Sequence, residues 1–276
     1  MAVNEQVDPP ETLPLDPRGY PQGDPLGAPL GDVRRRAGMH AALGEPVRLR
    51  IVDHLALGDA SPGELGSRFA MPTNLLAHHL KVLDEAGLIR RVRSEGDRRR
   101  QYVQLRLDDP TVAALTRTPA SWAHGHAGAA RPERVVFVCT ANSARSQLAR
   151  AAWRRVSDLP ALSGGTHPAE RVHPAAVRTG QRHGLDLTGA TTARIDDIAG
   201  PDDLLVAVCD NAHEELSRTR QLAPGSTERP EGDGGRRSWL HWHIADPVPA
   251  GSEEAFETAY AEITERVGRL AVALVV

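Results

Sequence analysis

Five small or polar residues separate Cys139 from Arg145, and this spacing can form an oxyanion site. An apolar run over residues 134–138 predicts a buried strand before Cys139, and a helical pattern over 147–155 follows Arg145. In a loop between a strand and a helix, backbone N–H groups and the helix N-terminus can hold a tetrahedral anion. Arginine can bind two oxygens of that anion. The same positive field favours a nucleophilic thiolate at Cys139.

Chain length and composition favour two domains that would position such a loop. The 276 residues exceed the usual domain size of roughly 100–200 residues. The longest apolar stretches, 204–209 and 270–276, are far shorter than the roughly 20 residues of a spanning helix, so we expect no membrane association. Cys139 and Cys209 are the two cysteines of the chain and cannot form a disulfide framework, which favours a reducing cytoplasm.

Composition divides the chain into four segments. Residues 1–32 are rich in proline and acidic residues, which predicts a disordered tail. Residues 33–110 form the first domain, and an Ala-, Gly- and Pro-rich composition predicts a linker over 111–132. Residues 133–276 form the second domain, in which 223–238 has the composition of a mobile surface loop.

The first domain is basic, although the chain as a whole is not. Residues 33–107 contain thirteen arginines and one lysine against eight acidic residues, while the net charge of the chain is −3. A basic segment in an acidic protein indicates a module that binds nucleic acid.

Three helices and a hairpin are predicted in this basic segment. Pro46 begins the first helix, the Ser-x-x-Glu sequence at 61–64 is a capping box for the second, and Thr73 begins the third. Two alternating strands, 88–93 and 100–107, then flank a turn-forming cluster. This order predicts a winged helix-turn-helix.

Two segments, 42–51 and 78–89, resemble the DNA-binding core of arsenical-repressor-type (ArsR) regulators. The resemblance covers about residues 35–107 and implies a homodimer that binds double-stranded DNA through the third helix and the wing. Metal-sensing members often carry a Cys-x-Cys pair where this chain has 61–65, so we expect no metal site. The implied DNA-binding residues are Thr73, Asn74, His78, Lys81, Arg98, Arg99 and Arg100.

Residues 136–149 resemble the phosphate-binding loop of low-molecular-weight protein tyrosine phosphatases and of the arsenate reductases built on that fold. Three further segments follow in the order of that family: Ser-Gly-Gly-Thr at 163–166, a helix over 173–183, and Asp246 before a proline. The resemblance implies a doubly wound parallel-sheet domain. The fold expected for the chain is therefore α/β, with an N-terminal winged helix-turn-helix (α+β) before a phosphatase-like domain.

The resemblance also implies roles for residues. Cys139 matches the nucleophile, Arg145 the oxyanion-binding arginine, and Asp246 the general acid of the phosphatases. Asn142 and Ser146 match residues that brace the loop and stabilise the thiolate. Without the resemblance, Cys139 could also be a structural cysteine and Asp246 a turn residue. The implied oxyanion-binding residues are Thr140, Ala141, Asn142, Ser143, Ala144 and Ser146.

The sequence His241-Trp242-His243 shortly precedes Asp246. Alternating histidines can bind a metal ion. The reductases carry a His-Trp pair at this place, so we expect an aromatic wall beside the site and no metal.

Three features bear on the reaction. Arg145-Ser146-Gln147 resembles the reductases, and Cys209 lies where thioredoxin-coupled reductases keep a second cysteine, but their third cysteine is absent from 211–216. We expect a bifunctional transcriptional regulator and arsenate reductase, with Cys139 as the thiolate nucleophile, that confers arsenical resistance and has no bound cofactor. Either Cys209 or an external thiol system, mycothiol with mycoredoxin or thioredoxin, would resolve its adduct. A phosphatase fused to a DNA-binding domain and a non-catalytic oxyanion-sensing regulator are the alternatives.

Overall fold

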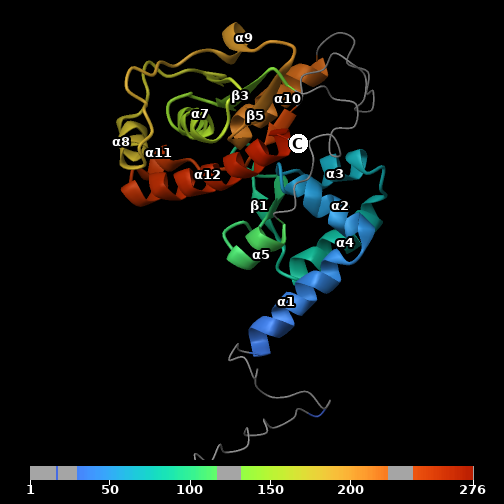
Figure 1. The fold of residues 1–276 in the computed structure, drawn as a ribbon. Helices are drawn as coiled ribbons and strands as arrows, with labels where there is room; N and C mark the ends of the chain where they lie inside the picture. Colours follow the sequence, from blue (N-terminus) through green and yellow to red (C-terminus); the bar gives the residue numbers. More distant parts are fainter. Residues whose placement is uncertain (1–16, 18–29, 117–131, 223–238, 276) are drawn as a thin grey trace, which may run out of the picture.

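The protein is described by a computed structural model that covers residue 17 and residues 30–116, 132–222 and 239–275 (Figure 1). Most of the expected tail, most of the expected linker and the expected loop 223–238 lie outside these residues.

The first domain is a winged helix-turn-helix, as predicted. The capping box is present, because the Ser61 hydroxyl accepts from the Glu64 N–H and the Glu64 carboxylate accepts from the Ser61 N–H. Strands β1 and β2 pair antiparallel, with Ile89 opposite Leu105. The elements are α1 (Leu30–Leu43), α2 (Pro46–Leu55), α3 (Pro62–Arg68), α4 (Thr73–Glu85), β1 (Ile89–Arg93), β2 (Gln101–Leu105) and α5 (Pro110–Leu115).

Helix α4 packs one face into the domain core. Leu76, Leu80 and Leu83 are buried in a cluster with residues of α2, α3 and the hairpin, as the helical spacing predicts. Gly87 follows the helix with a φ of 72°, a left-handed conformation that glycine adopts without strain and that ends α4.

Helix α5 lies across the predicted boundary between the first domain and the linker. Helix α5 begins at Pro110, after Asp109 caps it by accepting from the N–H groups of Thr111 and Val112. Val112 is fully buried in the core of the first domain. The domain therefore extends through α5, because an Asp-Pro pair that suggests a loop in sequence acts here as a helix start.

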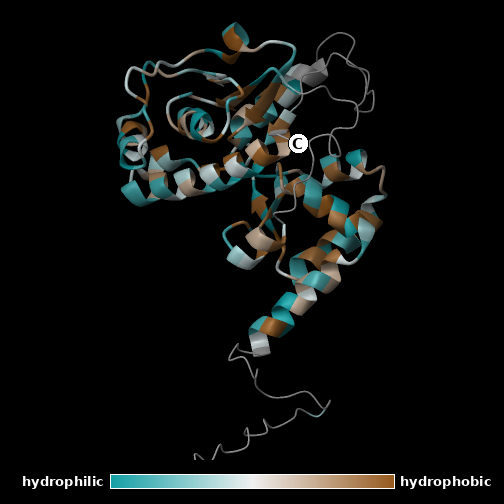
Figure 2. Cartoon of the chain, viewed as in Figure 1, coloured by the Kyte–Doolittle hydropathy of each residue, from teal (hydrophilic) through white to brown (hydrophobic). Residues whose placement is uncertain are grey.

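The second domain is built on a four-stranded parallel sheet in the order β4-β3-β5-β6. Apolar residues concentrate in the strands at its centre (Figure 2), and α12 packs along α7 (Figure 1). The elements are β3 (Arg134–Cys139), α7 (Arg145–Val156), β4 (Ala161–Gly165), α8 (Pro174–Arg182), α9 (Ile195–Ile198), β5 (Asp203–Ala207), α10 (Asp210–Leu222), β6 (Trp239–His241), α11 (Pro247–Ala250) and α12 (Glu253–Val275).

The strand order places a ligand site at the ends of β3 and β5. The chain runs outward from β3 to β4 and then returns to β5 on the other side of β3. In doubly wound sheets of this kind, the crevice at such a reversal lies beyond the carboxyl ends of the two central strands. Cys139 ends β3 and Cys209 follows β5 by two residues, so the topology brings both cysteines to that crevice.

The two domains share a buried polar interface. The Asp59 carboxylate of the first domain pairs with Arg266 of α12 at 3.0 Å and accepts hydrogen bonds from the Gln104 side chain and the His243 N–H. The Asp59 and Arg266 side chains are 0% and 5% exposed. Gly58 lies close enough to the second domain that a Cβ there would be 3.2 Å from the His241 carbonyl oxygen. The domains therefore pack as one unit.

We expect Asp59→Asn to destabilise the protein strongly, because it leaves the buried guanidinium of Arg266 without its counter-charge. The free energy of unfolding, measured by urea titration, should fall by about 3–5 kcal/mol. Asp108→Asn is the matched control, since Asp108 pairs with Arg90 at 54% side-chain exposure and its loss should cost no more than about 1 kcal/mol. Equal effects of the two substitutions would contradict this role of Asp59.

Candidate active site

The loop between β3 and α7 is held by hydrogen bonds on one side. Three of its carbonyl oxygens accept from the segment 167–173. Because C=O and N–H point in opposite directions across a trans peptide, the N–H groups that follow these carbonyls point away from that segment. Peptide donors that converge beside a helix N-terminus suit an anion. The acceptors are the carbonyl oxygens of Thr140, Ala141 and Ser143, and the respective donors are the N–H groups of His167, Ala169 and His173.

Asn142 fixes the shape of this loop. It is fully buried and has a φ of 49°, a left-handed conformation that asparagine tolerates better than most residues. Its side-chain oxygen accepts from the Ala193 N–H, and its amide nitrogen donates to the Ser146 hydroxyl at 2.9 Å. Gly165 of the predicted Ser-Gly-Gly-Thr segment lies against the loop, where a Cβ would be 2.6 Å from the Thr140 carbonyl oxygen.

The Cys139 sulfur is buried and bonded to one hydroxyl. Its Sγ lies 3.1 Å from the Ser146 Oγ, and the residue is 3% exposed. Because the Asn142 amide can only donate to Ser146, the Ser146 proton is free to point at the sulfur. A hydroxyl that donates in that direction would stabilise negative charge on the sulfur.

The Arg145 guanidinium is 5% exposed and binds three oxygen acceptors. Nη1 donates to the Ile244 carbonyl at 2.8 Å and to the Glu95 carboxylate at 3.0 Å, and Nη2 lies 3.0 Å from the Asp246 carboxylate. Burial lowers the pKa of Arg145, but the attraction of nearby acidic groups, which include the carboxylates of Asp246 and Glu95, outweighs burial and raises it. The guanidinium therefore remains charged.

Glu95 is a residue of this site that the sequence did not indicate. It belongs to the turn of the wing, fifty positions before Arg145, and its second carboxylate oxygen accepts from the Asp246 N–H at 2.8 Å. A turn-forming cluster such as 94–97 has no local signal that would direct one carboxylate to a loop of another domain.

Cys209 lies beside the loop between β3 and α7, inside the protein. It is 0% exposed, and its Sγ is 3.6 Å from the Thr140 Oγ1. Burial raises the pKa of the Cys209 thiol to about 11, although the Arg145 charge opposes this. At neutral pH the thiol is protonated.

The expectation of an aromatic wall at His241-Trp242-His243 is wrong. Trp242 is fully buried in the core, where its indole donates to the Leu57 carbonyl of the first domain. His241 and His243 each donate to Asp210, at 2.8 and 2.7 Å. Burial raises the pKa of Asp210, but the two histidine hydrogen bonds outweigh it and hold the pKa well below its ordinary value. In the part of the chain that the structure describes, no group of three or more His, Cys, Asp or Glu side chains could hold a metal ion.

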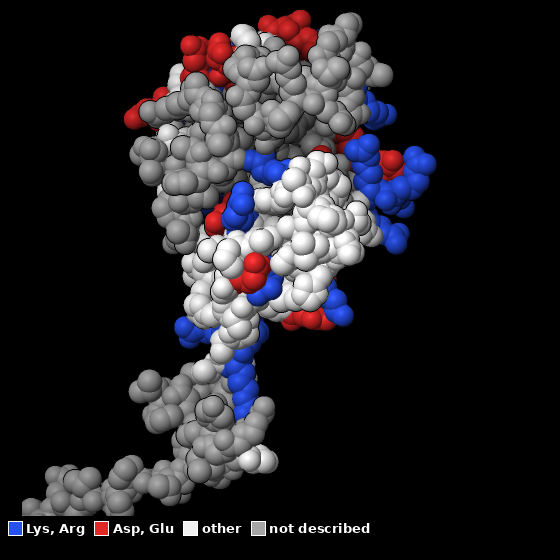
Figure 3. Space-filling model, turned by 90° about the vertical axis from the view of Figure 1, so that its right-hand side faces the viewer, with Lys and Arg blue, Asp and Glu red and all other residues white. Residues whose placement is uncertain are grey.

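The residues implied in DNA binding are on the surface of the first domain. Helix α4 exposes four of them, and the other three follow the wing turn, where the Arg99 side chain is 91% exposed. Figure 3 shows basic side chains gathered at one edge of the molecule and along α1. The exposed residues are Thr73, Asn74, His78, Lys81, Arg98, Arg99 and Arg100.

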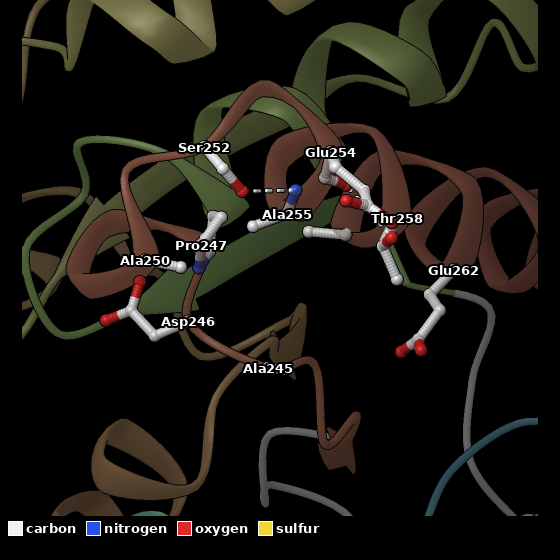
Figure 4. Close-up of a pocket in the computed structure, with 10 residues that line it drawn as sticks. Ala245, Asp246, Pro247, Ala250, Ser252, Glu254, Ala255, Thr258 and Glu262 are labelled. Carbon is white, nitrogen blue, oxygen red and sulfur yellow. Dashed lines mark hydrogen bonds between the residues drawn. The ribbon is translucent and has the colours of Figure 1, made fainter.

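Two hollows adjoin the site. One, of about 400 Å³, lies between Asp246 and α12 and includes Glu254 and Glu262 among its lining (Figure 4). The other, of about 610 Å³, is lined by Thr140 and by side chains of α10.

Among the described residues, no helix is long and apolar enough to span a membrane.

Comparisons with known proteins match the two domains separately. A family model described as low molecular weight phosphotyrosine protein phosphatase matches residues 134–275, and a helix-turn-helix domain model matches residues 43–92. Arsenate reductases from Oceanobacillus iheyensis and Bacillus licheniformis are 28% and 31% identical, over 49% and 50% of this chain and 88% and 94% of their own. The crystal structure of an arsenate reductase from Archaeoglobus fulgidus has a TM-score of 0.39 and 28% identity, over 50% of this chain and 98% of that one.

We expect Ser146→Ala to slow alkylation of Cys139 by iodoacetamide at neutral pH. The substitution removes the hydroxyl 3.1 Å from the sulfur, and a hydrogen bond to a charged group contributes about 1.5–3 kcal/mol, which corresponds to a rate about tenfold lower or more. Peptide mass spectrometry would follow Cys139 separately from Cys209. Ser163→Ala is the control, because the buried Ser163 hydroxyl has no hydrogen-bond partner in the structure. An unchanged rate in Ser146→Ala would remove the role of this hydroxyl.

Proposed function

Because the chain belongs to the low molecular weight phosphotyrosine protein phosphatase family through residues 134–275, we propose that its second domain is an arsenate reductase. The first domain, a helix-turn-helix by its match over residues 43–92, would make the chain a transcriptional regulator as well. The protein would thus combine both activities and act in the cytoplasm, where its DNA lies.

One arrangement carries the proposal: a buried sulfur at the start of an anion-binding loop that ends in arginine. Cys139 has a hydroxyl partner that can donate to its sulfur, and the hydrogen bonds of the loop carbonyls leave the following N–H groups pointing away from 167–173. Arg145 supplies a permanent positive charge at the helix start. A tetrahedral oxyanion held by Thr140, Ala141, Asn142, Ser143, Ala144, Arg145 and Ser146 would meet the nucleophile.

The reaction would proceed in two steps. The Cys139 thiolate attacks the arsenic of arsenate, an As–S bond forms, and one arsenate oxygen leaves as water after protonation. A second thiol then attacks the Cys139 sulfur and breaks the As–S bond. The two sulfurs form a disulfide, and the As–S electron pair passes to arsenic, which leaves as arsenite. Two thiols are oxidised and As(V) is reduced to As(III).

We propose that the second thiol is external, supplied by a mycothiol and mycoredoxin system or by thioredoxin. Cys209 is completely buried, and its pKa of about 11 keeps it protonated at neutral pH. The attacking species in disulfide exchange is the thiolate, so Cys209 is poorly prepared to attack. Its position beside Thr140 nevertheless makes it the internal alternative.

A phosphatase is the second candidate function, and Asp246 is the observation that favours it. Its carboxylate lies 3.0 Å from the Arg145 guanidinium, beside any oxyanion that Arg145 would bind. There it could protonate the leaving alcohol of a phosphate ester. The arsenate reductase is preferred because of the two relatives with that name, at 28% and 31% identity.

We propose that the first domain binds double-stranded DNA as a homodimer. Helix α4 exposes a polar face while its apolar face is buried, as a recognition helix requires. Among the described side chains of α1, Met39 and Ala42 are buried and residues 31–38 are exposed. This exposed part leaves room for a second copy.

Cys139→Ser should abolish turnover, because an alcohol cannot replace the thiolate as nucleophile. We expect no arsenite from arsenate with any thiol system and no hydrolysis of an aryl phosphate, while circular dichroism and DNA affinity stay unchanged. Turnover at the wild-type rate would disprove the assignment.

Two further variants act as controls that separate the reactions. Cys209→Ser should keep most arsenate turnover if an external thiol is the resolving group, and its loss would assign that step to Cys209. Asp246→Asn should reduce aryl phosphate hydrolysis if the protein is a phosphatase. Hydrolysis by the wild type without any thiol, together with no arsenite, would select the phosphatase.

Arg98, Arg99 and Arg100 changed together to Ala should weaken DNA binding for all sequences alike and reduce its dependence on salt. Each phosphate contact that is lost lowers the salt slope by about 0.9. Fluorescence anisotropy with a labelled duplex over a series of salt concentrations would measure both. The control is Arg171, Arg178 and Arg182 changed to Ala, three arginines of the second domain, which should leave the slope as it is. A slope unaffected by the wing substitutions would exclude the wing from the DNA contact.

A further inference from the structure

The tip of the wing is docked on the second domain. The Ser94 hydroxyl donates to the Glu214 carboxylate at 2.6 Å, the Glu95 N–H donates to Asp210 at 2.7 Å, and the Asp97 N–H donates to Glu214 at 3.0 Å. Ser94 is 2% exposed. The N–H groups of Glu95 and Asp97 are therefore bonded to carboxylates of α10.

The docked tip places the Glu95 carboxylate on the oxyanion-binding arginine. One oxygen accepts from Arg145 at 3.0 Å, and the other accepts from the Asp246 N–H at 2.8 Å. The Glu95 side chain is 30% exposed, while Arg145 is 5% exposed. The Glu95 carboxylate of the first domain is thus bound to Nη1 of Arg145, a donor that an oxyanion in the site would need.

The Glu95 carboxylate and an oxyanion would compete for Arg145 because both are negatively charged. Arg145 already faces the carboxylates of Glu95 and Asp246, and the Cys139 sulfur lies in the same site. Adding a tetrahedral dianion next to Glu95 would bring like charges together in a poorly solvated site, where their repulsion is strong. Glu95 is the one of the two carboxylates that sits on a hairpin turn of another domain.

We propose that the oxyanion site is also the effector site of the DNA-binding domain: a tetrahedral oxyanion displaces Glu95 from Arg145 and releases the tip of the wing. The inference rests on the proposed oxyanion-binding function of the Cys139 loop and extends it to the control of DNA binding. Its ligands are arsenate or phosphate, which share shape and charge.

The movement is confined to the wing tip. Two buried contacts join the domains without involving the anion: the pair of Asp59 with Arg266 and the hydrogen bond of Trp242 with Leu57. These contacts hold the domains together when the tip leaves. The tip itself, residues 94–97, is a turn between two strands, which can move without unpacking the core.

The direction of the coupling follows from what the docked tip contacts. DNA phosphates cannot approach the N–H groups of Glu95 and Asp97 while Asp210 and Glu214 bind them, and those carboxylates would repel DNA. Oxyanion and DNA therefore both select the undocked tip. Two ligands that bind the same state each increase the affinity of the protein for the other, typically by about 5- to 150-fold. Oxyanion should increase DNA affinity, and DNA should increase oxyanion affinity.

The test uses the full chain and its Glu95→Gln variant, which keeps the shape of the side chain and removes the charge. Glu133→Gln is the matched control, because Glu133 is exposed at the opposite end of β3 from Cys139. Calorimetric titration with inorganic phosphate, and separately with arsenate, should give affinities at least about fivefold higher for Glu95→Gln than for the wild type. Glu133→Gln should match the wild type.

Two further measurements report on the wing. Hydrogen exchange of the peptide containing 94–97 should become faster in the wild type when phosphate is added, because the bonds of Glu95 and Asp97 to α10 are broken. DNA affinity, measured with a random-sequence duplex at low salt, should rise by about fivefold or more with phosphate, compared with chloride at the same ionic strength. Glu95→Gln should exchange faster and bind DNA more tightly before phosphate is added.

The outcomes separate this inference from the function on which it rests. Phosphate and arsenate that bind equally to the wild type and to Glu95→Gln, with exchange and DNA affinity unchanged, would overturn the inference and leave the oxyanion site in place. No binding of either anion to any of the three proteins would overturn the oxyanion site itself, and the inference with it.

Discussion

Three parts of the chain meet on the guanidinium of Arg145. The loop after β3 carries it, the segment before α11 contributes the Asp246 carboxylate and the Ile244 carbonyl, and the wing contributes Glu95. A buried cation requires such partners, because an unpaired charge in a poorly solvated site is costly. Arg145 is therefore both the anion-binding group that we propose and the group through which the wing of the first domain contacts the site.

The sheet and the interface hold these parts in place. The reversal of strand order around β3 puts the two cysteines at one crevice, and the buried pair of Asp59 with Arg266 joins the first domain to α12. Because the interface is polar and buried, its groups must be paired in one arrangement to be stable. The orientation of the wing toward the site follows from that arrangement.

The chemistry of the site depends on a short chain of hydrogen bonds. Asn142 donates to Ser146, which leaves the Ser146 proton for the Cys139 sulfur. In the reaction that we propose, a Cys139 thiolate would attack arsenic or phosphorus alike, so the nucleophile would not select the substrate. The groups around Cys139 would select the substrate. Asp246 could protonate the leaving alcohol of a phosphate ester, and a second thiol could form the disulfide that reduction of arsenate requires.

Features that depend on near neighbours could be predicted from the sequence, and features that depend on distant contacts could not. The strand, loop and helix around Cys139 and the capping box at Ser61 follow from spacing over a few residues, since strand alternation, helix periodicity and capping are local effects. The burial of Trp242 beneath the first domain and the placement of Glu95 on Arg145, fifty positions away, leave no local pattern. Only the packing of one domain on the other decides them, because it determines which buried groups need a partner and which side chains are near enough to provide one.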